Sequence, residues 1–175
     1  MFCGMKYFTK QQVQEALKKT INNGRKKYRH RNYLILKTLS ESGLRVSELI
    51  NLTSYNINFE ESIFYIKGKA GKIRVVDIPS ELSQLLQMYI KTEGLKAKDR
   101  IFPLTRYGIF KITKKYANTN PHAFRHTYAI NLLRKTKNIR YVQKQLGHSS
   151  LQITEQYLQF IEYEKEKKQL SDLMS

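Results

Sequence analysis

Hydrophobic residues recur at helical intervals along most of the chain. They do so between residues 13 and 21, after Thr9 and Gln12 at the spacing of a capping box, which predicts a first helix that ends near residues 22–24. A second helix is predicted from about Tyr28 to Ser42, because Gly43 then breaks the pattern. Further helices are predicted, by residue number, at 44–50, 81–91, 106–117, 122–134, 139–146 and 161–170, with one more segment around Tyr157 that Ser150 can cap.

The pattern changes to that of strands between residues 63 and 78. Residues 63–66 and 73–78 are rich in β-branched and aromatic side chains, and they flank the basic, glycine-bearing segment Lys67–Lys72. This predicts a β-hairpin with a positively charged tip. The chain is therefore predicted to be mostly α-helical with one small antiparallel β-hairpin or sheet, an α+β fold.

Length and composition limit the number of domains, the cellular location and the cysteine chemistry of the protein. The 175 residues, 41% of them hydrophobic, fit one domain over residues 1–175, with residues 1–6 as a flexible leader. No stretch approaches a membrane span and the first ten residues lack the apolar region of a signal peptide, which predicts a cytoplasmic protein without a membrane partner. Cys3 is the only cysteine, which excludes an intramolecular disulfide and a cysteine-built zinc site.

The net charge points to a polyanionic partner. Lys and Arg outnumber Asp and Glu by 32 to 14, giving +18, whereas the last segment, Glu162–Ser175, carries four acids and three lysines. The positive charge therefore belongs to the body of the protein and not to a tail. Charge alone leaves DNA, RNA and membrane headgroups open as partners, and a merely solvated surface as well.

Candidate chemistry is concentrated in the last third of the chain. Within Pro121–His126, the side chains of His122 and Arg125 lie three residues apart near a predicted helix N-terminus, where they share a face and free N–H groups attract anions. This pair is a weak signal by itself. It gains weight from His148, 23 residues after Arg125, and from Tyr157, nine residues further, because a phenol can attack a phosphodiester that cationic groups hold.

Four segments together resemble one family. Ser42-Gly-Leu-Arg-Val-Ser-Glu-Leu49, Pro121-His-Ala-Phe-Arg-His126, Leu146-Gly-His-Ser-Ser150 and Tyr157 are similar, in order and spacing, to the motifs of the tyrosine recombinase or phage integrase family, which includes the Xer-type enzymes. The resemblance runs from about Tyr7 to Phe160, and it implies the tyrosine recombinase catalytic-domain fold.

The resemblance also implies a role for each candidate catalytic residue. Arg45 and Arg125 would clamp the scissile phosphate, and His148 would donate a further hydrogen bond to its oxygens. Tyr157 would be the nucleophile, and His122 occupies the position associated with proton transfer from it. Lys69, at the hairpin tip, would protonate the departing 5′-oxygen, and Glu48, one turn after Arg45, would support the site by orienting a histidine or an arginine.

Other residues have weaker assignments. Lys67 and Lys72 flank Lys69 and are predicted to contact the DNA backbone. Arg25, Lys26 and Lys27 also suit DNA phosphates, although a solvated helix start explains them equally well. His126 is predicted to face another side of the helix and to be structural, and Tyr163 is a distant second candidate for the nucleophile.

The resemblance finally implies an activity and its partners. The chain is expected to be the catalytic domain of a site-specific recombinase that cuts and rejoins double-stranded DNA through a 3′-phosphotyrosyl bond, without metal, ATP or another cofactor. It is expected to be a monomer in solution and a homo-tetramer on paired DNA sites, with residues 161–175 as a possible protomer contact, and to lack the family's amino-terminal DNA-clamp domain. Supercoil relaxation by the related type IB topoisomerase chemistry and a non-enzymatic DNA-binding module are the alternatives.

Overall fold

The computed structural model describes residues 6–68 and 71–173 of the chain; Lys69, a predicted catalytic residue, lies outside the described residues, as does most of the predicted leader 1–6. Its elements are α1 (Lys10–Asn22), the 3₁₀ turn η1 (Lys26–Tyr28), α2 (Arg29–Ser42), α3 (Val46–Ile50), the 3₁₀ turn η2 (Ser54–Asn56), β1 (Ile57–Asn58), β2 (Ile63–Lys67), β3 (Ile73–Asp77), α4 (Ser80–Thr92), α5 (Arg106–Ala117), α6 (Pro121–Thr136), α7 (Ile139–Leu146) and α8 (Gln152–Leu173). The predicted α+β composition is confirmed.

The helix boundaries follow the signals in the sequence. Thr9 and Gln12 form the capping box of α1, and Gly43 ends α2 in the left-handed region with a φ of 61°. Thr105, Asn120 and Asn138 each accept a hydrogen bond from a backbone N–H in the first turn of α5, α6 and α7. These caps satisfy N–H groups that have no partner within the helix.

The sheet has three antiparallel strands in the order β1-β2-β3. The predicted hairpin is present: Ile63 pairs with Asp77 and Lys67 with Ile73, and the buried Phe64 and Val76 lie opposite each other. Strand β1 was not predicted, because two residues are too short to show an alternating pattern.

One predicted boundary is wrong. The segment around Tyr157 and the predicted helix 161–170 are a single helix, α8, which runs without interruption from Gln152 to Leu173. The stretch contains no glycine or proline, so nothing in it breaks the helical hydrogen bonds. The backbone N–H of Gln152 does donate to the Ser150 hydroxyl, as the capping prediction requires.

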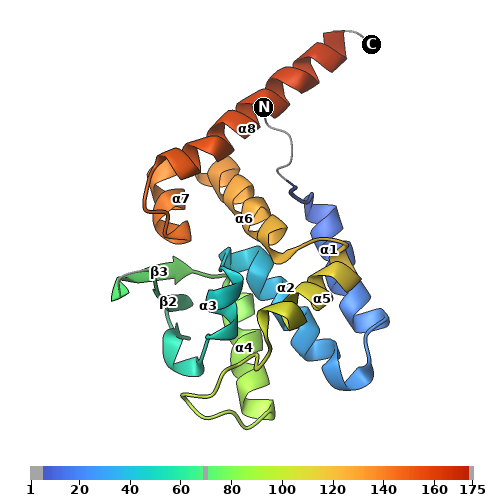
Figure 1. Cartoon of the computed structure of the whole chain (residues 1–175), viewed down its shortest axis with the longest axis vertical. Coiled ribbons are helices and arrows are strands. Elements are labelled where there is room, and N and C mark those ends of the chain that lie inside the picture. Colours follow the sequence, from blue (N-terminus) through green and yellow to red (C-terminus); the bar gives the residue numbers. More distant parts are fainter. Residues whose placement is uncertain (1–5, 69–70, 174–175) are drawn as a thin grey trace.

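Hydrophobic side chains form two clusters. The larger one joins α1 to α5 with the sheet, and the smaller one joins α6, α7 and the first half of α8. Figure 1 shows α6 and α7 above the sheet and α3, with α8 projecting away from the body towards the C-terminus. Helix α6 contacts α2 and α7, and α7 contacts β3, and the candidate site lies among these elements.

The part of α8 just after Tyr157 is held by the segment that precedes α1. The Tyr7 ring packs edge-on against Phe160 at a centroid distance of 5.2 Å, and the Tyr7 hydroxyl donates to the Glu164 carboxylate at 2.5 Å. Arg134 of α6 donates to the same carboxylate at 3.1 Å. We call Tyr7, Arg134 and Glu164 the α8 latch. In the described part of the chain, no helix is both long and apolar enough to cross a membrane.

Candidate functional site

Arg125 forms the buried centre of the site. Only 2% of the residue is exposed, and its guanidinium donates to the carbonyl oxygens of Gly43 and Leu146, each at 2.6 Å. These carbonyls belong to helix ends, where backbone acceptors lack intrahelical partners and carry partial negative charge. Burial lowers the pKa of Arg125 to about 10, and the positive charge of Arg45 adds to the effect, so the side chain stays protonated at neutral pH.

Arg45 is the more accessible of the two predicted clamp residues. It lies at the N-cap of α3, with 42% of its side chain exposed. Its guanidinium makes long contacts of 3.4 Å to the carbonyls of Leu146 and Gly147, and an ion pair of 3.1 Å with Glu48. Both predicted clamp arginines, which lie 80 residues apart in the sequence, therefore donate to carbonyl oxygens at the end of α7.

Glu48, one turn after Arg45, forms ion pairs with two arginines. Besides Arg45, it accepts two hydrogen bonds of 2.8 Å from the two terminal nitrogens of Arg74 in β3. Burial raises the pKa of the Glu48 carboxyl, but the hydrogen bonds and charge of Arg74, with the N–H and charge of Arg45, outweigh it, and the pKa is lowered. Glu48 is therefore ionised at neutral pH and holds two guanidinium groups together.

The role of Arg74 in this arrangement was not found in the sequence. Its Nε donates to the Gln145 carbonyl at 3.0 Å, so that a third arginine reaches the end of α7. Arg74 shares a face of β3 with the buried Val76, and an arginine at such an inward position is the signal that points to a buried ion pair. Gly147 permits the approach: a side-chain carbon there would meet Arg74 Cδ at 2.7 Å, and the φ of 63° is itself strained for other residues.

An open pocket of about 260 Å³ gathers the cationic groups. Three predicted catalytic residues, Arg45, His122 and Arg125, line it together with Arg106 from the first turn of α5, which was not predicted. None of the described residues that line it is acidic; the remaining four are Leu44, Val46, Ser47 and Pro121. Burial lowers the pKa of His122, with Arg125 and Arg45 adding to the effect. The pocket suits a small anionic group such as a phosphodiester.

His148 follows α7 and is held by α8. Its Nδ1 lies 3.0 Å from the Oγ1 of Thr154, a fully buried residue, and its ring is nearly parallel to that of Tyr157 at a centroid distance of 6.2 Å. Burial, with the charges of Arg125 and Arg45, lowers the pKa of His148 to about 4. The contact to Nδ1 leaves Nε2 as the nitrogen available to a ligand.

Tyr157 is 3% exposed and packs in the smaller cluster. Burial raises the pKa of its phenol, and the charges of Arg125 and Arg45 offset this only in part. The predicted orientation of His126 is wrong, because His126 Nδ1 lies 3.1 Å from the Tyr157 hydroxyl. The physical reason is helical geometry: His126 is one turn after His122 and shares its face, with ring centroids 4.3 Å apart.

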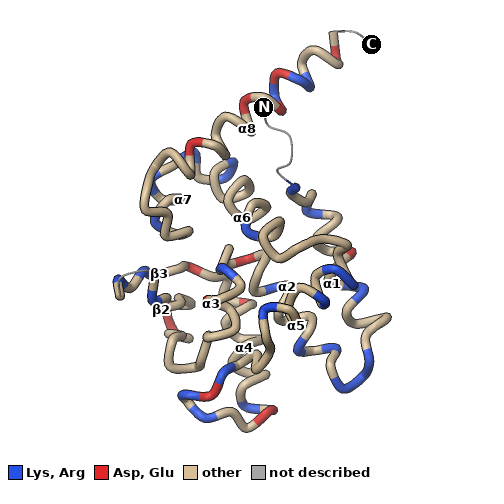
Figure 2. The backbone as a smooth tube through the Cα atoms, in the orientation of Figure 1, with Lys and Arg blue, Asp and Glu red and all other residues tan. Residues whose placement is uncertain are grey.

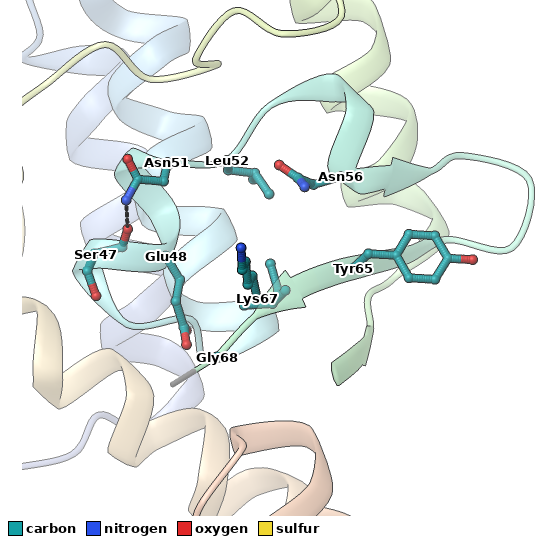
Figure 3. Close-up of a pocket in the computed structure, with 9 residues that line it drawn as sticks. Ser47, Glu48, Asn51, Leu52, Asn56, Tyr65, Lys67 and Gly68 are labelled. Atoms are coloured by element: carbon teal, nitrogen blue, oxygen red, sulfur yellow. Dashed lines mark hydrogen bonds between the residues drawn. The ribbon is translucent and has the colours of Figure 1, made fainter. Parts of the chain in front are cut away.

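Lys67 lines a second cleft, of about 440 Å³, between α3 and β2. Figure 3 shows the Lys67 side chain extending between β2 and the side chains of Leu52 and Asn56, with Tyr65 pointing away. Lys72 is exposed. The described residues contain no cluster of three or more histidine, cysteine or acidic side chains that would hold a metal ion.

The other basic candidates lie apart from the site. Arg25, Lys26 and Lys27 are exposed in the connection between α1 and α2. In the view of Figure 2, this connection and the strands β2 and β3 lie on opposite sides. A small cleft of about 130 Å³ beside Arg25 also receives Lys111 and Lys115 from α5, which extends the positive surface there.

Comparison with known proteins shows the family of the chain. The model of the phage integrase family matches residues 6–162. A tyrosine recombinase of Pseudothermotoga lettingae is 37% identical over 169 residues, which cover 88% of this chain and 56% of the relative. The crystal structure of XerA recombinase aligns with a TM-score of 0.73 at 25% identity, covering 86% of this chain and 57% of XerA.

A second structure, the Tn1549 transposon integrase in complex with a circular intermediate DNA, aligns with a TM-score of 0.68 at 26% identity, covering 88% of this chain and 61% of the integrase. The chain therefore spans little more than half the length of these relatives. The family match covers nearly all of its helical body and includes every described residue of the predicted catalytic set. From its sequence and its fold alike, the chain belongs to the phage integrase family of tyrosine recombinases.

Proposed function

We propose that this chain is the catalytic part of a site-specific DNA recombinase, which cleaves and rejoins DNA through a 3′-phosphotyrosyl bond. One observation carries the proposal: Arg45, Arg125 and His122 line a single cationic pocket, and Tyr157 is held beside the histidines that adjoin it. Cations that line a small open pocket bind the phosphodiester, and a nearby phenol attacks it.

Binding of the phosphate uses groups that are already fixed in place. Arg125 gives two of its five N–H donors to helix-end carbonyls and keeps three for a ligand. Arg45 is exposed and holds its carbonyl contacts at 3.4 Å, so a phosphate oxygen competes for its donors at little cost. The Nε2 of His148 supplies a further hydrogen bond. Each such donor contributes about 3 kcal/mol to transition-state stabilisation in comparable sites.

The chemical step forms one P–O bond and breaks another. The Tyr157 oxygen attacks phosphorus, its proton passes to a base, and the 5′-oxygen leaves with a proton that we assign to Lys69 by the family resemblance. The phosphotyrosyl bond keeps the energy of the phosphodiester, so the 5′-hydroxyl reverses the step without ATP. The arginines supply the positive charge that a metal ion supplies in other phosphoryl-transfer enzymes, and no metal is required in this scheme.

Double-stranded DNA is the proposed partner. The net charge of +18 and the Tn1549 integrase, solved with a circular intermediate DNA, support it. Lys67, Lys72 and the segment Arg25–Lys27 are proposed contacts to the DNA backbone, and Glu48 is proposed to position Arg45. We further propose a monomer in free solution and a homo-tetramer on paired sites, in which the exposed end of α8 contacts a neighbouring protomer.

A denaturing-gel assay for a covalent protein–DNA adduct tests this function. Nicked duplexes that trap the cleaved strand are incubated with the chain in EDTA, with Tyr157→Phe and Tyr163→Phe alongside. We expect an adduct with the wild type and with Tyr163→Phe, and none with Tyr157→Phe. DNA binding without any adduct on a pool of duplexes of randomised sequence would favour a non-enzymatic binding module instead, and an adduct that requires a metal would refute metal independence.

A further inference from the structure

We propose that His126 accepts the proton of the Tyr157 hydroxyl during strand cleavage and returns it during rejoining. This inference rests on the proposed function, because it assigns a role within that reaction. It concerns a residue that the sequence motifs leave without a part in the chemistry, and it follows from the position of one side chain against the attacking oxygen.

The geometry of the contact is that of a proton transfer pair. His126 Nδ1 lies 3.1 Å from the Tyr157 hydroxyl oxygen, within the range in which a base takes a proton directly. The two rings are tilted by 60° with centroids 5.6 Å apart. Tyr157 is buried, and in the described part of the chain His126 is the only side chain that forms a hydrogen bond with this hydroxyl.

His122, the residue at the position that the family resemblance associates with this proton, lies one turn away. It is exposed, lines the cationic pocket and touches His126 edge-on, with ring centroids 4.3 Å apart. His126 therefore lies between His122 and the phenol. From its place in the pocket, His122 faces a bound phosphate, whereas His126 contacts the attacking oxygen of Tyr157.

The electrostatic surroundings keep His126 able to accept a proton. Burial lowers its pKa to about 4, and His122 and Arg125 on the same helix add to the effect, so the ring is neutral at pH 7. From α8, Tyr157 faces it, and the Tyr157 phenol, its pKa raised by burial, keeps its proton in the free chain. A phosphate bound in the pocket brings negative charge, which raises the pKa of His126 and so favours the transfer at the moment when the phosphate is in place.

The step balances. As the Tyr157 oxygen forms its bond to phosphorus, the O–H bond breaks and the proton moves to His126 Nδ1, while the bond from phosphorus to the 5′-oxygen breaks and that oxygen takes a proton from the general acid. In rejoining, the 5′-hydroxyl attacks phosphorus and gives its proton back to the deprotonated general acid, while the bond from phosphorus to the Tyr157 oxygen breaks and the departing phenolate takes its proton back from His126. No oxidant, reductant or further reactant is consumed.

Two substitutions separate proton acceptance from mere positioning. His126→Asn keeps an acceptor atom near the place of Nδ1 but has no basicity, and His126→Phe removes both. With a pool of nicked duplexes of randomised sequence, we expect single-turnover adduct formation at pH 7 to fall by about 100-fold to 10,000-fold in both variants, with unchanged DNA affinity. We also expect the rate of His126→Asn to keep rising at alkaline pH, where the wild-type rate has levelled off. The proposal would be overturned if His126→Asn formed the adduct at the wild-type rate, or if His126→Phe formed it faster than the wild type.

A spectroscopic measurement decides the same question without activity. Long-range ¹H–¹⁵N correlation spectra distinguish the two neutral tautomers of a histidine, and we expect His126 to carry its proton on Nε2, which leaves Nδ1 free to accept. A proton on Nδ1 contradicts the inference. If the wild type forms no adduct on any duplex, the proposed function fails; if it forms the Tyr157 adduct and His126→Asn does so equally fast, only the role of His126 fails.

Discussion

At the scale of single residues, the site is built from donors that helix ends and neighbouring side chains hold in place. Thr154 is fully buried with its hydroxyl 3.0 Å from His148 Nδ1, and this contact selects which nitrogen of a neutral ring carries the proton. If His148 is to donate from Nε2, the Thr154 hydroxyl must donate to Nδ1.

Thr154→Val tests this contact, because valine has nearly the same shape and no hydroxyl. Loss of one hydrogen bond of about 1 to 1.5 kcal/mol predicts a fall in adduct formation of roughly tenfold. Single-turnover kinetics measure the fall. Thr154→Ser keeps the hydroxyl and is expected to retain most of the rate, and equal rates for the two variants would contradict a role in holding the tautomer.

Arg106 is the cationic residue of the pocket that the sequence motifs do not contain. It is exposed and forms no ion pair or hydrogen bond with the described residues, so its guanidinium is available to DNA. We predict that Arg106→Ala weakens DNA binding and reduces the slope of log affinity against log salt by about 0.9, the value for one phosphate contact. Fluorescence anisotropy at several salt concentrations measures the slope. Arg106→Lys keeps the charge and should keep the slope.

At the scale of elements, the end of α7 is the point on which the site depends. The carbonyls of Gln145, Leu146 and Gly147 receive Arg74, Arg125 and Arg45 from three different elements. The buried Gln145 side chain and the Tyr141 hydroxyl also bind Asp77, which joins α7 to β3. A change in the last turn of α7 therefore displaces all three arginines.

Gly147→Ala is expected to destabilise the fold by about 2–4 kcal/mol, because it combines left-handed strain of about 1–2 kcal/mol with a clash against Arg74. Gly94→Ala is the matched control: it has nearly the same φ, 64°, but a side-chain carbon there meets no atom within 4 Å. Urea unfolding of both variants measures the difference. Equal losses in the two would show that Arg74 adjusts freely and that the contact is unimportant.

The α8 latch is a second set of contacts that fixes one element against others, because it joins α8 to α6 and to the segment before α1. Glu164 accepts hydrogen bonds from Tyr7 and Arg134, and burial, with the Glu164 carboxylate, raises the pKa of the Tyr7 phenol. Glu164→Gln weakens both contacts, and we predict faster hydrogen exchange of the α8 amides around residue 164, by about fivefold to tenfold, for a loss of about 1 kcal/mol. Glu166→Gln, an exposed neighbour on the same helix, serves as the control. Unchanged exchange in Glu164→Gln would mean that ring packing alone holds α8.

At the scale of the whole molecule, stability should depend on pH through two half-buried histidines, His126 and His148. The pKa values of His126 and His148 are both lowered to about 4, against about 6.5 in an unfolded chain. Between these values the unfolded chain binds protons that the folded chain does not, so stability is fully present above about pH 6.5 and falls as the pH decreases towards 4.

Because both rings are partly exposed, we expect a total loss on the order of 3 kcal/mol between pH 7 and pH 4 from these two groups. Urea unfolding across this range measures it, and the double variant His126→Asn/His148→Asn should show a shallower dependence. A double variant that loses as much stability as the wild type over the range would assign the dependence to the carboxylates instead.

The sequence predicted the local structure because the relevant forces act over a few residues. Thr9, Gly43, Thr105, Asn120, Asn138 and Gly147 cap or end helices through contacts within one turn, and the hairpin follows from two β-rich runs around a glycine-bearing tip. The family motifs carried most of the remaining information: they named Arg45, His122 and Arg125, which share the pocket, and the buried Tyr157. The continuous α8 was missed because the charged stretch after Tyr157 has no clear apolar period, although it contains no glycine or proline that would end a helix.

The contacts between these local units were decided only by tertiary structure. These contacts join residues that lie 21 to 102 positions apart in the sequence: His126 with Tyr157, Arg74 with Glu48, and three arginines with the end of α7. Local periodicity does not predict which residues touch at such separations. The sequence by itself therefore determined which chemical groups this protein has and which elements carry them. The packing of α6 against α2 and α8, and of α7 against β3, determined which of those groups touch, because it brings the helix ends, the arginines and the phenol together.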